Sequence, residues 1–254
     1  NQPVDSLTSL KGSGNNRLFR LSSGSETYAL KVYTRKPEDK ADRFHHETAA
    51  LQFLASARIG AVPRLIATDA GAGVALMSWE EGSPCHTAHD SDIAQMAAFI
   101  GTLKAACALP DAQALPFATE ACLSPKDLQA QIEERFAGLE ALTTESALQT
   151  LLRAAARPRL SHHLDIARQS LLRWDAPLSR KRQTLSPSDF GLHNALRMTD
   201  GRLVFVDFEY FGWDDPVKLL ADTFWHPGVP LDFERAWSFV QQTAAVWLDD
   251  PEWR

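Results

Sequence analysis

The spacing of apolar residues changes near residue 90 from mainly alternation to mainly a helical period, and this change restricts the fold more than any other feature. Residues 5–81 alternate apolar and polar side chains over short runs and contain one helical stretch. From residue 90 onward, apolar residues recur every three or four positions. Residues 79–84 carry Gly82 and Pro84, which predict a hinge. The sequence therefore predicts an α+β fold with two lobes: a small β-rich lobe, residues 1–81, and a larger helical lobe, residues 82–254.

Glycine, proline and acidic residues mark the ends of the expected helices and strands. Two strands joined by a Gly-Ser-Glu turn are predicted at 16–23 and 27–33. A helix is predicted from Pro37 to Gly60, because proline and acidic residues open it and glycine follows it. Strands are expected at 64–69, 73–80, 184–196 and 202–209, and helices at 92–108, 124–142, 145–156, 162–174, 215–226 and 231–249.

Composition excludes several classes of protein. The chain has 254 residues, 44% of them hydrophobic, and a net charge of −6, which is typical of a soluble globular protein and unlike a nucleic-acid binder. No apolar run approaches the ~18 residues of a membrane span. No leader is recognisable, although the first residue is Asn1 and a trimmed start stays open. Three widely spaced cysteines, Cys85, Cys107 and Cys122, favour free thiols and a cytoplasmic location. The oligomeric state is not readable.

A glycine turn and a lysine predict a site for phosphates in the small lobe. Gly12, Ser13, Gly14 and Asn15 form a turn between strands, where backbone N–H groups can approach an anion. An ordinary hairpin is the alternative. Strand alternation places Ala29 and Lys31 on one face, which suits a nucleotide on the sheet with the lysine at its phosphates; an exposed edge lysine is the alternative.

The position of a carboxylate inside an apolar helical stripe supports the predicted phosphate site. Glu47 lies between Phe44 and Leu51 on the face that Leu54 continues. A buried carboxylate is costly unless it is paired, and Lys31 on the neighbouring strand is the natural partner.

The segment 184–209 carries three further polar residues at informative spacing. Asp189-Phe190-Gly191 has the letters of the tripeptide that holds magnesium in protein kinases. Asn194, however, stands five residues after Asp189, the spacing of a kinase catalytic loop, and Asp207 follows at a strand end. Asp189 is therefore interpreted as the catalytic base, and Asn194 and Asp207 as metal ligands. Asp207 and Glu209 are expected on one strand face, where they could hold a divalent cation or form a solvated strand end.

Taken in order, these residues resemble the aminoglycoside phosphotransferase and choline kinase family, over nearly the whole chain. The resemblance implies a kinase-like fold and an ATP- and Mg-dependent transfer of the γ-phosphate to a small-molecule hydroxyl. It further implies that Lys31 binds ATP phosphates and that Glu47 orients Lys31. The adenine would be held near the hinge segment Met77, Ser78, Trp79 and Glu80.

This chain departs from the family pattern at two places. The histidines usual two residues before and two after the catalytic Asp are replaced by Pro187 and Gly191, and a histidine comes late, at His193. Altered loop packing with retained chemistry is expected. The acid usual three residues past the Asp-Pro step is Leu219, with Asp222 nearby.

Two other functions are open: a catalytically inactive nucleotide-binding module and a protein kinase-like enzyme. Retention of Lys31, Asp189, Asn194 and Asp207 argues against the first, and the missing Ala-Pro-Glu segment against the second. The expected acceptor is an amino alcohol, an aminoglycoside or a sugar, and the sequence does not distinguish among them. Aromatic and acidic residues near 210–215, with Trp225, would favour a cationic acceptor if they met in one pocket; the alternative is that they form core and a helix cap.

Overall fold

In a computed structural model, the chain forms two compact units, each described here by itself. The structure describes residues 3–10, 16–34, 42–142, 146–171 and 176–248. The first unit combines residues 1–120 with 184–254, and the second comprises residues 121–183. The predicted boundary between residues 81 and 82 falls inside the first unit and stays a prediction.

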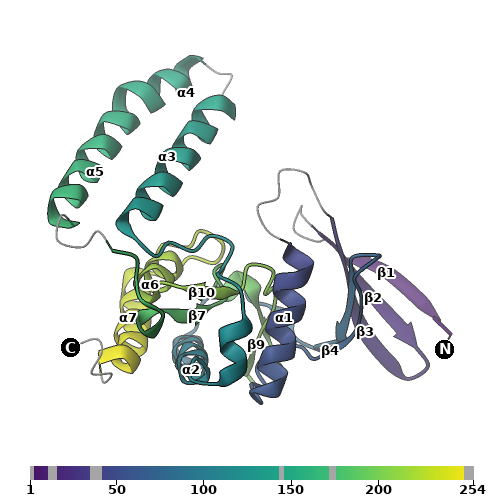
Figure 1. The fold of residues 1–254 in the computed structure, drawn as a ribbon. Coiled ribbons are helices and arrows are strands. Elements are labelled where there is room, and N and C mark those ends of the chain that lie inside the picture. The colour runs from purple at the N-terminus through teal and green to yellow at the C-terminus, as the bar shows by residue number, and fades with distance from the viewer. Residues whose placement is uncertain (1–2, 11–15, 35–41, 143–145, 172–175, 249–254) are drawn as a thin grey trace. The chain divides into compact units, whose positions relative to one another are not determined.

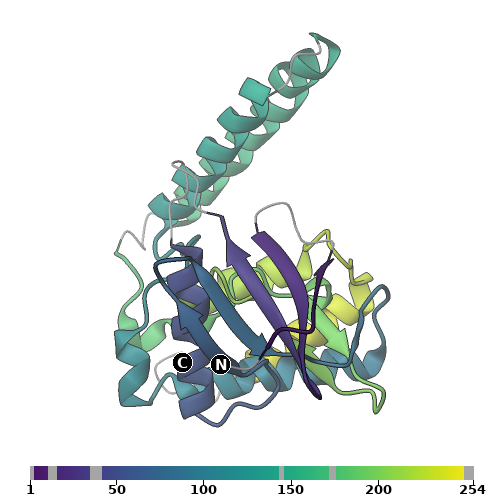
Figure 2. The same cartoon turned by 90° about the vertical axis from the view of Figure 1, so that its right-hand side faces the viewer.

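The alternating segments form one antiparallel five-stranded sheet in the order β1-β2-β3-β5-β4 (Figure 1). Its strands are β1 (Ser6–Leu10), β2 (Asn16–Ser23), β3 (Glu26–Tyr33), β4 (Leu65–Asp69) and β5 (Val74–Ser78). β2 and β3 form the predicted hairpin, in which Ser23 pairs with Glu26. Gly24 begins its two-residue loop with φ +59°, a value that glycine adopts without a steric penalty. Figure 2 shows the face of this sheet that α1 (Arg43–Ser56) leaves open.

Helix α1 packs on β4 and β5 and places a polar residue among its apolar ones. Asp42 caps its N-terminus by accepting a hydrogen bond from the His45 N–H. The predicted end at Gly60 is wrong: the helix ends four residues earlier, because Arg58 adopts φ +58° and the Ile59 N–H donates to the Leu54 carbonyl. This is a Schellman end, usually signalled by glycine and here formed around an arginine. The predicted start at Pro37 lies outside the described residues.

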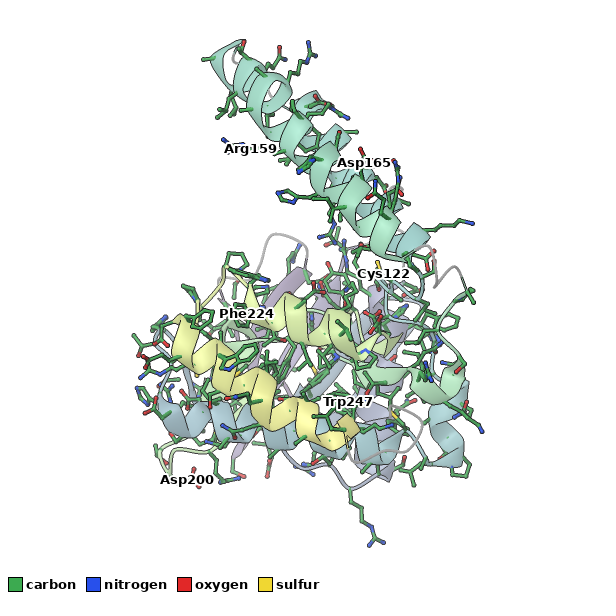
Figure 3. All side chains as sticks on the ribbon, turned by 90° about the vertical axis from the view of Figure 1, so that its left-hand side faces the viewer. Cys122, Arg159, Asp165, Asp200, Phe224 and Trp247 are labelled. Carbon is green, nitrogen blue, oxygen red and sulfur yellow. The ribbon has the colours of Figure 1, made fainter. Side chains whose placement is uncertain are left out.

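The rest of the first unit is mainly helical, with short strands that hold its loops. Its long helices are α2 (Asp90–Ala106), α6 (Pro216–Phe224) and α7 (Phe233–Leu248), and α2 packs along α7. Figure 3 shows α6 and α7 side by side, with Phe224 and Trp247 labelled on them. The short strands form two further sheets, β6 (Ser83–Pro84) with β8 (Ala195–Arg197) and β9 (Leu203–Phe205), and β7 (Thr184–Ser186) with β10 (Gly212–Asp214). The predicted strands at 184–196 and 202–209 are thus shorter than expected, because loops interrupt them.

An aromatic core fills the space beneath these loops. Phe99 of α2 contacts Phe190, Phe205 and Phe208, with ring centroids 4.5–6.3 Å apart. All four rings are buried. The loops that follow β7 and β9 are therefore anchored from below by packed aromatic side chains.

The second unit is a helical hairpin of α3 (Pro125–Leu142) and α5 (Arg157–Leu171), which lie side by side in Figure 1. α4 (Ser146–Leu151) runs into α5 through a π-helical turn, Leu152–Ala156. The predicted break between residues 156 and 162 is wrong, because Pro158 is tolerated directly after this turn, where the hydrogen-bond pattern has already changed. Arg157 donates from Nε to Glu140 at 3.3 Å and links the two helices.

Two findings concern the cysteines and membrane spans. Cys85, Cys107 and Cys122 form no disulfide with one another in the described part of the chain. None of the helices in the described part of the chain has the length and apolarity needed to cross a membrane.

Among the glycines in the described part of the chain, Gly212 leaves the least room for a Cβ atom. A Cβ there would meet the Ala118 nitrogen at 2.4 Å and the Pro116 oxygen at 2.5 Å. Because both are backbone atoms, we expect Gly212→Ala to lower the free energy of unfolding by about 3 kcal/mol in urea denaturation. Gly60→Ala is the matched control: no atom lies within 4 Å of its added Cβ, and it should change stability by no more than about 0.5 kcal/mol. Equal stability of the two variants would contradict this packing.

Candidate active site

A cavity of about 630 Å³ lies in the first unit between the five-stranded sheet and the loops of the helical part. Its wall is mainly apolar, with a few polar groups directed into it, as is usual for small-molecule sites. Its apolar lining includes Leu18, Leu51, Leu196 and Phe208. The lining also contains the predicted residues Ala29, Lys31, Glu47, Met77, Ser78, Trp79, Glu80, Asn194 and Asp207. The predicted residues Gly12, Ser13, Gly14 and Asn15 lie outside the described part of the chain.

Lys31 lies at the polar end of this cavity, in contact with three carboxylates. Its Nζ is 2.6 Å from Glu47 Oε2, 2.6 Å from Asp207 Oδ1 and 3.2 Å from Glu209 Oε2. The predicted Lys31–Glu47 pair is therefore confirmed as a contact, and it is buried. Strand β3, helix α1 and the loop after β9 meet at this one ammonium group.

Glu47 has further partners that fix its orientation. The Tyr33 hydroxyl donates to Oε2 at 2.7 Å, and the Phe208 N–H donates to Oε1 at 3.2 Å. Both carboxylate oxygens are thus used, which reduces the free-energy cost of burying this charge in an apolar stripe.

The electrostatics follow from the excess of negative charge. Burial by itself would lower the pKa of Lys31, but Glu47, Asp207 and Glu209 outweigh it and hold that pKa above its ordinary value. Burial raises the pKa of Glu209, and Asp207 and Glu47 add to this effect while Lys31 opposes it. Lys31 is therefore held charged, with acidic groups around it.

Glu209 is more enclosed than the other predicted metal ligands. It is 3% exposed, accepts a hydrogen bond from the Asn16 amide and lies 3.8 Å from Arg43. The expectation that Asp207 and Glu209 share a strand face is wrong. β9 ends at Phe205, and Asp207 adopts φ +67°, a left-handed conformation that turns the chain there.

The hinge segment lies against β8. The Ser78 N–H donates to the Arg64 carbonyl at 2.8 Å, and the Ser78 hydroxyl donates to Glu80 at 2.6 Å. At Gly82 a Cβ would meet Leu196 Cβ at 2.9 Å, so a glycine is needed for the segment to pass so close to β8.

Asp189 and Asn194 belong to one loop, between β7 and β8. Asn194 Nδ2 donates to the Asp189 carbonyl at 2.9 Å and lies 3.3 Å from Asp189 Oδ2. The Val206 N–H donates to the Asn194 carbonyl at 2.9 Å, which brings the Asp189 loop beside Asp207. Phe190 is buried in the aromatic core, so the middle residue of the Asp-Phe-Gly tripeptide anchors the loop.

Two histidines contact Asp189, and one of them was not anticipated. His193 Nε2 lies 3.2 Å and His226 Nε2 lies 2.9 Å from the same oxygen, Asp189 Oδ1. These hydrogen bonds, that of His193 first, hold the pKa of Asp189 well below its usual range, against the opposing effect of burial. His193 could be suspected from its place in the loop. His226 lies 37 residues beyond Asp189, and no local pattern indicates it.

Two groups of side chains could be considered for a metal ion. One consists of Asp189, His193 and His226, and the other of Glu47, Asp207 and Glu209. In the first, the imidazole rings stack with centroids 3.9 Å apart and planes at 1°. Each Nε2 lone pair lies in its own ring plane, so parallel stacked rings cannot both direct a lone pair at one ion ~2.1 Å away. In the second, the Lys31 ammonium occupies the centre.

Asn194 and Asp207 fit a hard divalent cation better than either group. Both line the cavity, and they offer amide and carboxylate oxygens, the ligand types that Mg²⁺ prefers. The Asp207 side chain is 26% exposed, so its carboxylate is accessible from the cavity.

The aromatic residues near position 213 do not form an acceptor pocket. Phe211, Trp213 and Asp214 are buried in the core, and the Trp213 indole donates to the Ala112 carbonyl at 2.8 Å. Asp215 caps α6 by accepting from the Val217 N–H at 2.7 Å. The predicted convergence is thus wrong, and the alternative of core packing with a helix cap is correct. Trp225 is 78% exposed, apart from this core.

Packing also explains why Leu219 stands where the family usually has an acidic residue. Leu219 is 1% exposed and belongs to the core beneath α6. The neighbouring Lys218 lies 2.6 Å from Asp222 and 3.3 Å from the buried Asp214. In this chain a lysine between two acids stabilises the segment after β10.

Removing the central ammonium should destabilise the fold. We expect Lys31→Met to lower the free energy of unfolding by about 3–5 kcal/mol at pH 7, because it leaves Glu47 and Glu209 buried without their shared cation. Combined with Glu47→Gln, the loss should be smaller than the sum by about 0.5–3 kcal/mol. The exposed Lys126→Met is the control and should have little effect. Strictly additive losses would show that the two residues are not coupled.

Comparisons with known proteins agree with the kinase-like fold. The phosphotransferase enzyme family matches residues 6–249. No curated protein sequence matches this chain. A spectinomycin phosphotransferase solved with ADP and spectinomycin is 12% identical, with a TM-score of 0.63 over 95% of this chain and 75% of its own. A choline kinase from Cryptosporidium parvum Iowa II is 14% identical, with a TM-score of 0.64 over 96% and 74%. A macrolide 2'-phosphotransferase from Brachybacterium faecium is 18% identical, with a TM-score of 0.62 over 96% and 79%.

At these identities the solved structures support the fold alone, and they confirm the predicted kinase-like arrangement. The sequence match covers most of the chain and bears out the predicted resemblance. This chain therefore belongs to the phosphotransferase enzyme family.

Proposed function

We propose that this protein transfers the γ-phosphate of ATP to a hydroxyl group of a small molecule. One observation carries the proposal: Lys31, Asn194 and Asp207 line a single cavity, and Asn194 is hydrogen-bonded to an ionised Asp189. Phosphoryl transfer requires a cation at the phosphates, a metal site and an acceptor for the hydroxyl proton, and these four residues supply them. Similar proteins solved with ADP or with AMP add support.

The nucleotide would lie on the sheet. Its adenine would contact the apolar side chains of Ala29 and Met77, near the segment from Ser78 to Glu80, and its phosphates would meet Lys31. The cavity volume of about 630 Å³ is within the usual range for a site of this kind. Glu47 holds the Lys31 ammonium in place, so the lysine needs no reorganisation when phosphates bind. The binding of phosphates by Gly12, Ser13, Gly14 and Asn15 stays a prediction.

Asn194 and Asp207 would hold Mg²⁺, with Glu209 as a further predicted ligand. A bound Mg²⁺ supplies charge neutralisation at the phosphate oxygens. Asp189 accepts the proton of the acceptor hydroxyl while the oxygen of that hydroxyl attacks the γ-phosphorus. The bond between the γ-phosphorus and the bridging β-phosphate oxygen breaks, and ADP leaves. The low pKa of Asp189 keeps it ionised at neutral pH, which suits a group that orients the hydroxyl by a strong hydrogen bond.

The acceptor class stays at the level of a small-molecule alcohol: an amino alcohol, an aminoglycoside or a sugar. Because Phe211, Trp213 and Asp214 are core residues, they give no support for a cationic acceptor. A screen of cationic and neutral alcohols by coupled ADP release, at low and high salt, separates these classes. An advantage of cations that shrinks with salt indicates electrostatic capture.

Asp207→Ala should abolish Mg-dependent ATP turnover while leaving the fold intact. The reason is that loss of a metal carboxylate weakens neutralisation of the phosphate charge. Steady-state ADP release with and without Mg²⁺ measures the effect, and thermal unfolding checks the fold. Asp200→Ala, an exposed acid paired with Arg202, serves as control. Turnover of Asp207→Ala at the wild-type rate would exclude the metal assignment.

Asp189→Asn should leave ATP binding unchanged and lower transfer by ~10²-fold or more, since the amide cannot accept the hydroxyl proton. ATP affinity by calorimetry and single-turnover phosphate transfer measure the two quantities separately. A larger loss of ATP affinity than of transfer would return Asp189 to the metal role suggested by the Asp-Phe-Gly letters. Absence of any turnover in the wild-type protein would instead favour the inactive nucleotide-binding module.

A further inference from the structure

We infer that His193 and His226 form a positioning pair that fixes the carboxylate of Asp189 through one oxygen and leaves the other for the acceptor hydroxyl. The inference rests on the proposed function and deepens it. It assigns a role to residues 225–228, the segment after α6, which neither the sequence motifs nor the family resemblance had connected with catalysis.

Both imidazoles lie within hydrogen-bonding distance of a single carboxylate oxygen. His193 Nε2 and His226 Nε2 lie 3.2 Å and 2.9 Å from Asp189 Oδ1. An ionised carboxylate only accepts hydrogen bonds, so both nitrogens carry protons and donate. Oδ2 has a weaker contact, with Asn194 Nδ2 at 3.3 Å. The Asp189 side chain is 39% exposed, so a ligand can approach it.

The backbone determines which nitrogen of His226 carries the proton. The Gly228 N–H donates to His226 Nδ1 at 3.0 Å, so Nδ1 is the acceptor and Nε2 carries the proton in the neutral ring. The ring is therefore held at both ends, by a backbone N–H on one side and by the catalytic carboxylate on the other. This arrangement is typical of a group that orients another, since each hydrogen bond fixes the direction of the next.

Two glycines make room for the stacked pair. A Cβ at Gly191 would meet His193 Nδ1 at 2.8 Å, and a Cβ at Gly228 would meet His193 Cγ at 2.8 Å. Gly191 stands at one of the positions where the family usually has histidine. With glycine at that position, the His193 ring from the same loop lies where a side chain at residue 191 would be.

Rotation of the carboxylate is the motion that this pair prevents. Without His226, Asp189 would keep one imidazole and the Asn194 contact, and its Oδ2 could turn away from the attacking oxygen. Misplacement of a reacting group by about 1 Å can lower a rate by ~10²-fold without loss of substrate binding. The pair should therefore act on kcat and leave the KM for ATP unchanged.

The kinetic test uses ATP hydrolysis with water as acceptor, so that it needs no identified alcohol. We expect His226→Ala to lower kcat by about 10- to 100-fold with the KM for ATP within about twofold. His226→Gln, which retains an N–H donor near the Nε2 position, should recover part of the rate. His45→Ala, which removes an exposed imidazole on α1, is the control and should match wild type. Wild-type kcat in His226→Ala would overturn the inference.

A double variant separates this inference from the proposed function. If His226 acts through Asp189, His226→Ala added to Asp189→Asn should cause no further loss of kcat. Wild-type turnover by Asp189→Asn alone would overturn the proposed function. Full activity of His226→Ala beside an inactive Asp189→Asn would overturn only the positioning role.

A spectroscopic measurement needs no turnover. Long-range ¹H–¹⁵N spectra of the ¹⁵N-histidine-labelled wild-type protein should show neutral His226 protonated at Nε2, and Asp189→Asn should shift the Nε2 resonances of both His226 and His193. A neutral His226 protonated at Nδ1, or resonances unchanged by Asp189→Asn, would contradict the pair.

Discussion

The buried contact of Lys31 with Glu47, Asp207 and Glu209 is the interaction on which the first unit depends. It joins the third strand of the sheet, helix α1, which packs on that sheet, and the loop that follows β9. Glu47 lies 16 residues and Asp207 lies 176 residues from Lys31 in sequence. Because buried carboxylates without a cation would be strongly unfavourable, the charge of one lysine determines whether the three segments can meet. The same charge is what a phosphate would meet in the cavity.

The loop that carries Asp189 is held by a different kind of force. Phe190 and Phe208, which follow Asp189 and Asp207 directly, are buried in the aromatic core. Asp189 and Asp207 are thus each next to a buried ring that holds the backbone, and the hydrogen bond from the Val206 N–H to the Asn194 carbonyl joins the two loops. Apolar packing fixes the backbone, and hydrogen bonds then orient the side chains. These separate roles of packing and hydrogen bonding are expected where polar side chains must be held in precise positions and still be accessible to a ligand.

The left-handed conformation of Asp207 shows what the site demands of the backbone. A non-glycine residue at φ +67° is uncommon and costs free energy that surrounding contacts must offset. Here the Lys31 ion pair and the burial of Phe208 provide those contacts. The turn directs the Asp207 carboxylate to Lys31, whereas Glu209 is enclosed between Lys31, Arg43 and Asn16. Two acids only two residues apart therefore have different surroundings.

The sequence by itself determined the α+β class, the hairpin at Gly24 and the pairing of Lys31 with Glu47, because each depends on local periodicity or on one unavoidable buried charge. The Asp189–Asn194 spacing likewise placed both residues in one loop. Only the tertiary structure decided that Asp207 leaves the strand and that Trp213 belongs to the core. It also brought His226 to Asp189 from 37 residues away. These features depend on contacts between segments that are remote in sequence. A side chain that completes such a contact, as His226 does, leaves no periodic pattern along the chain.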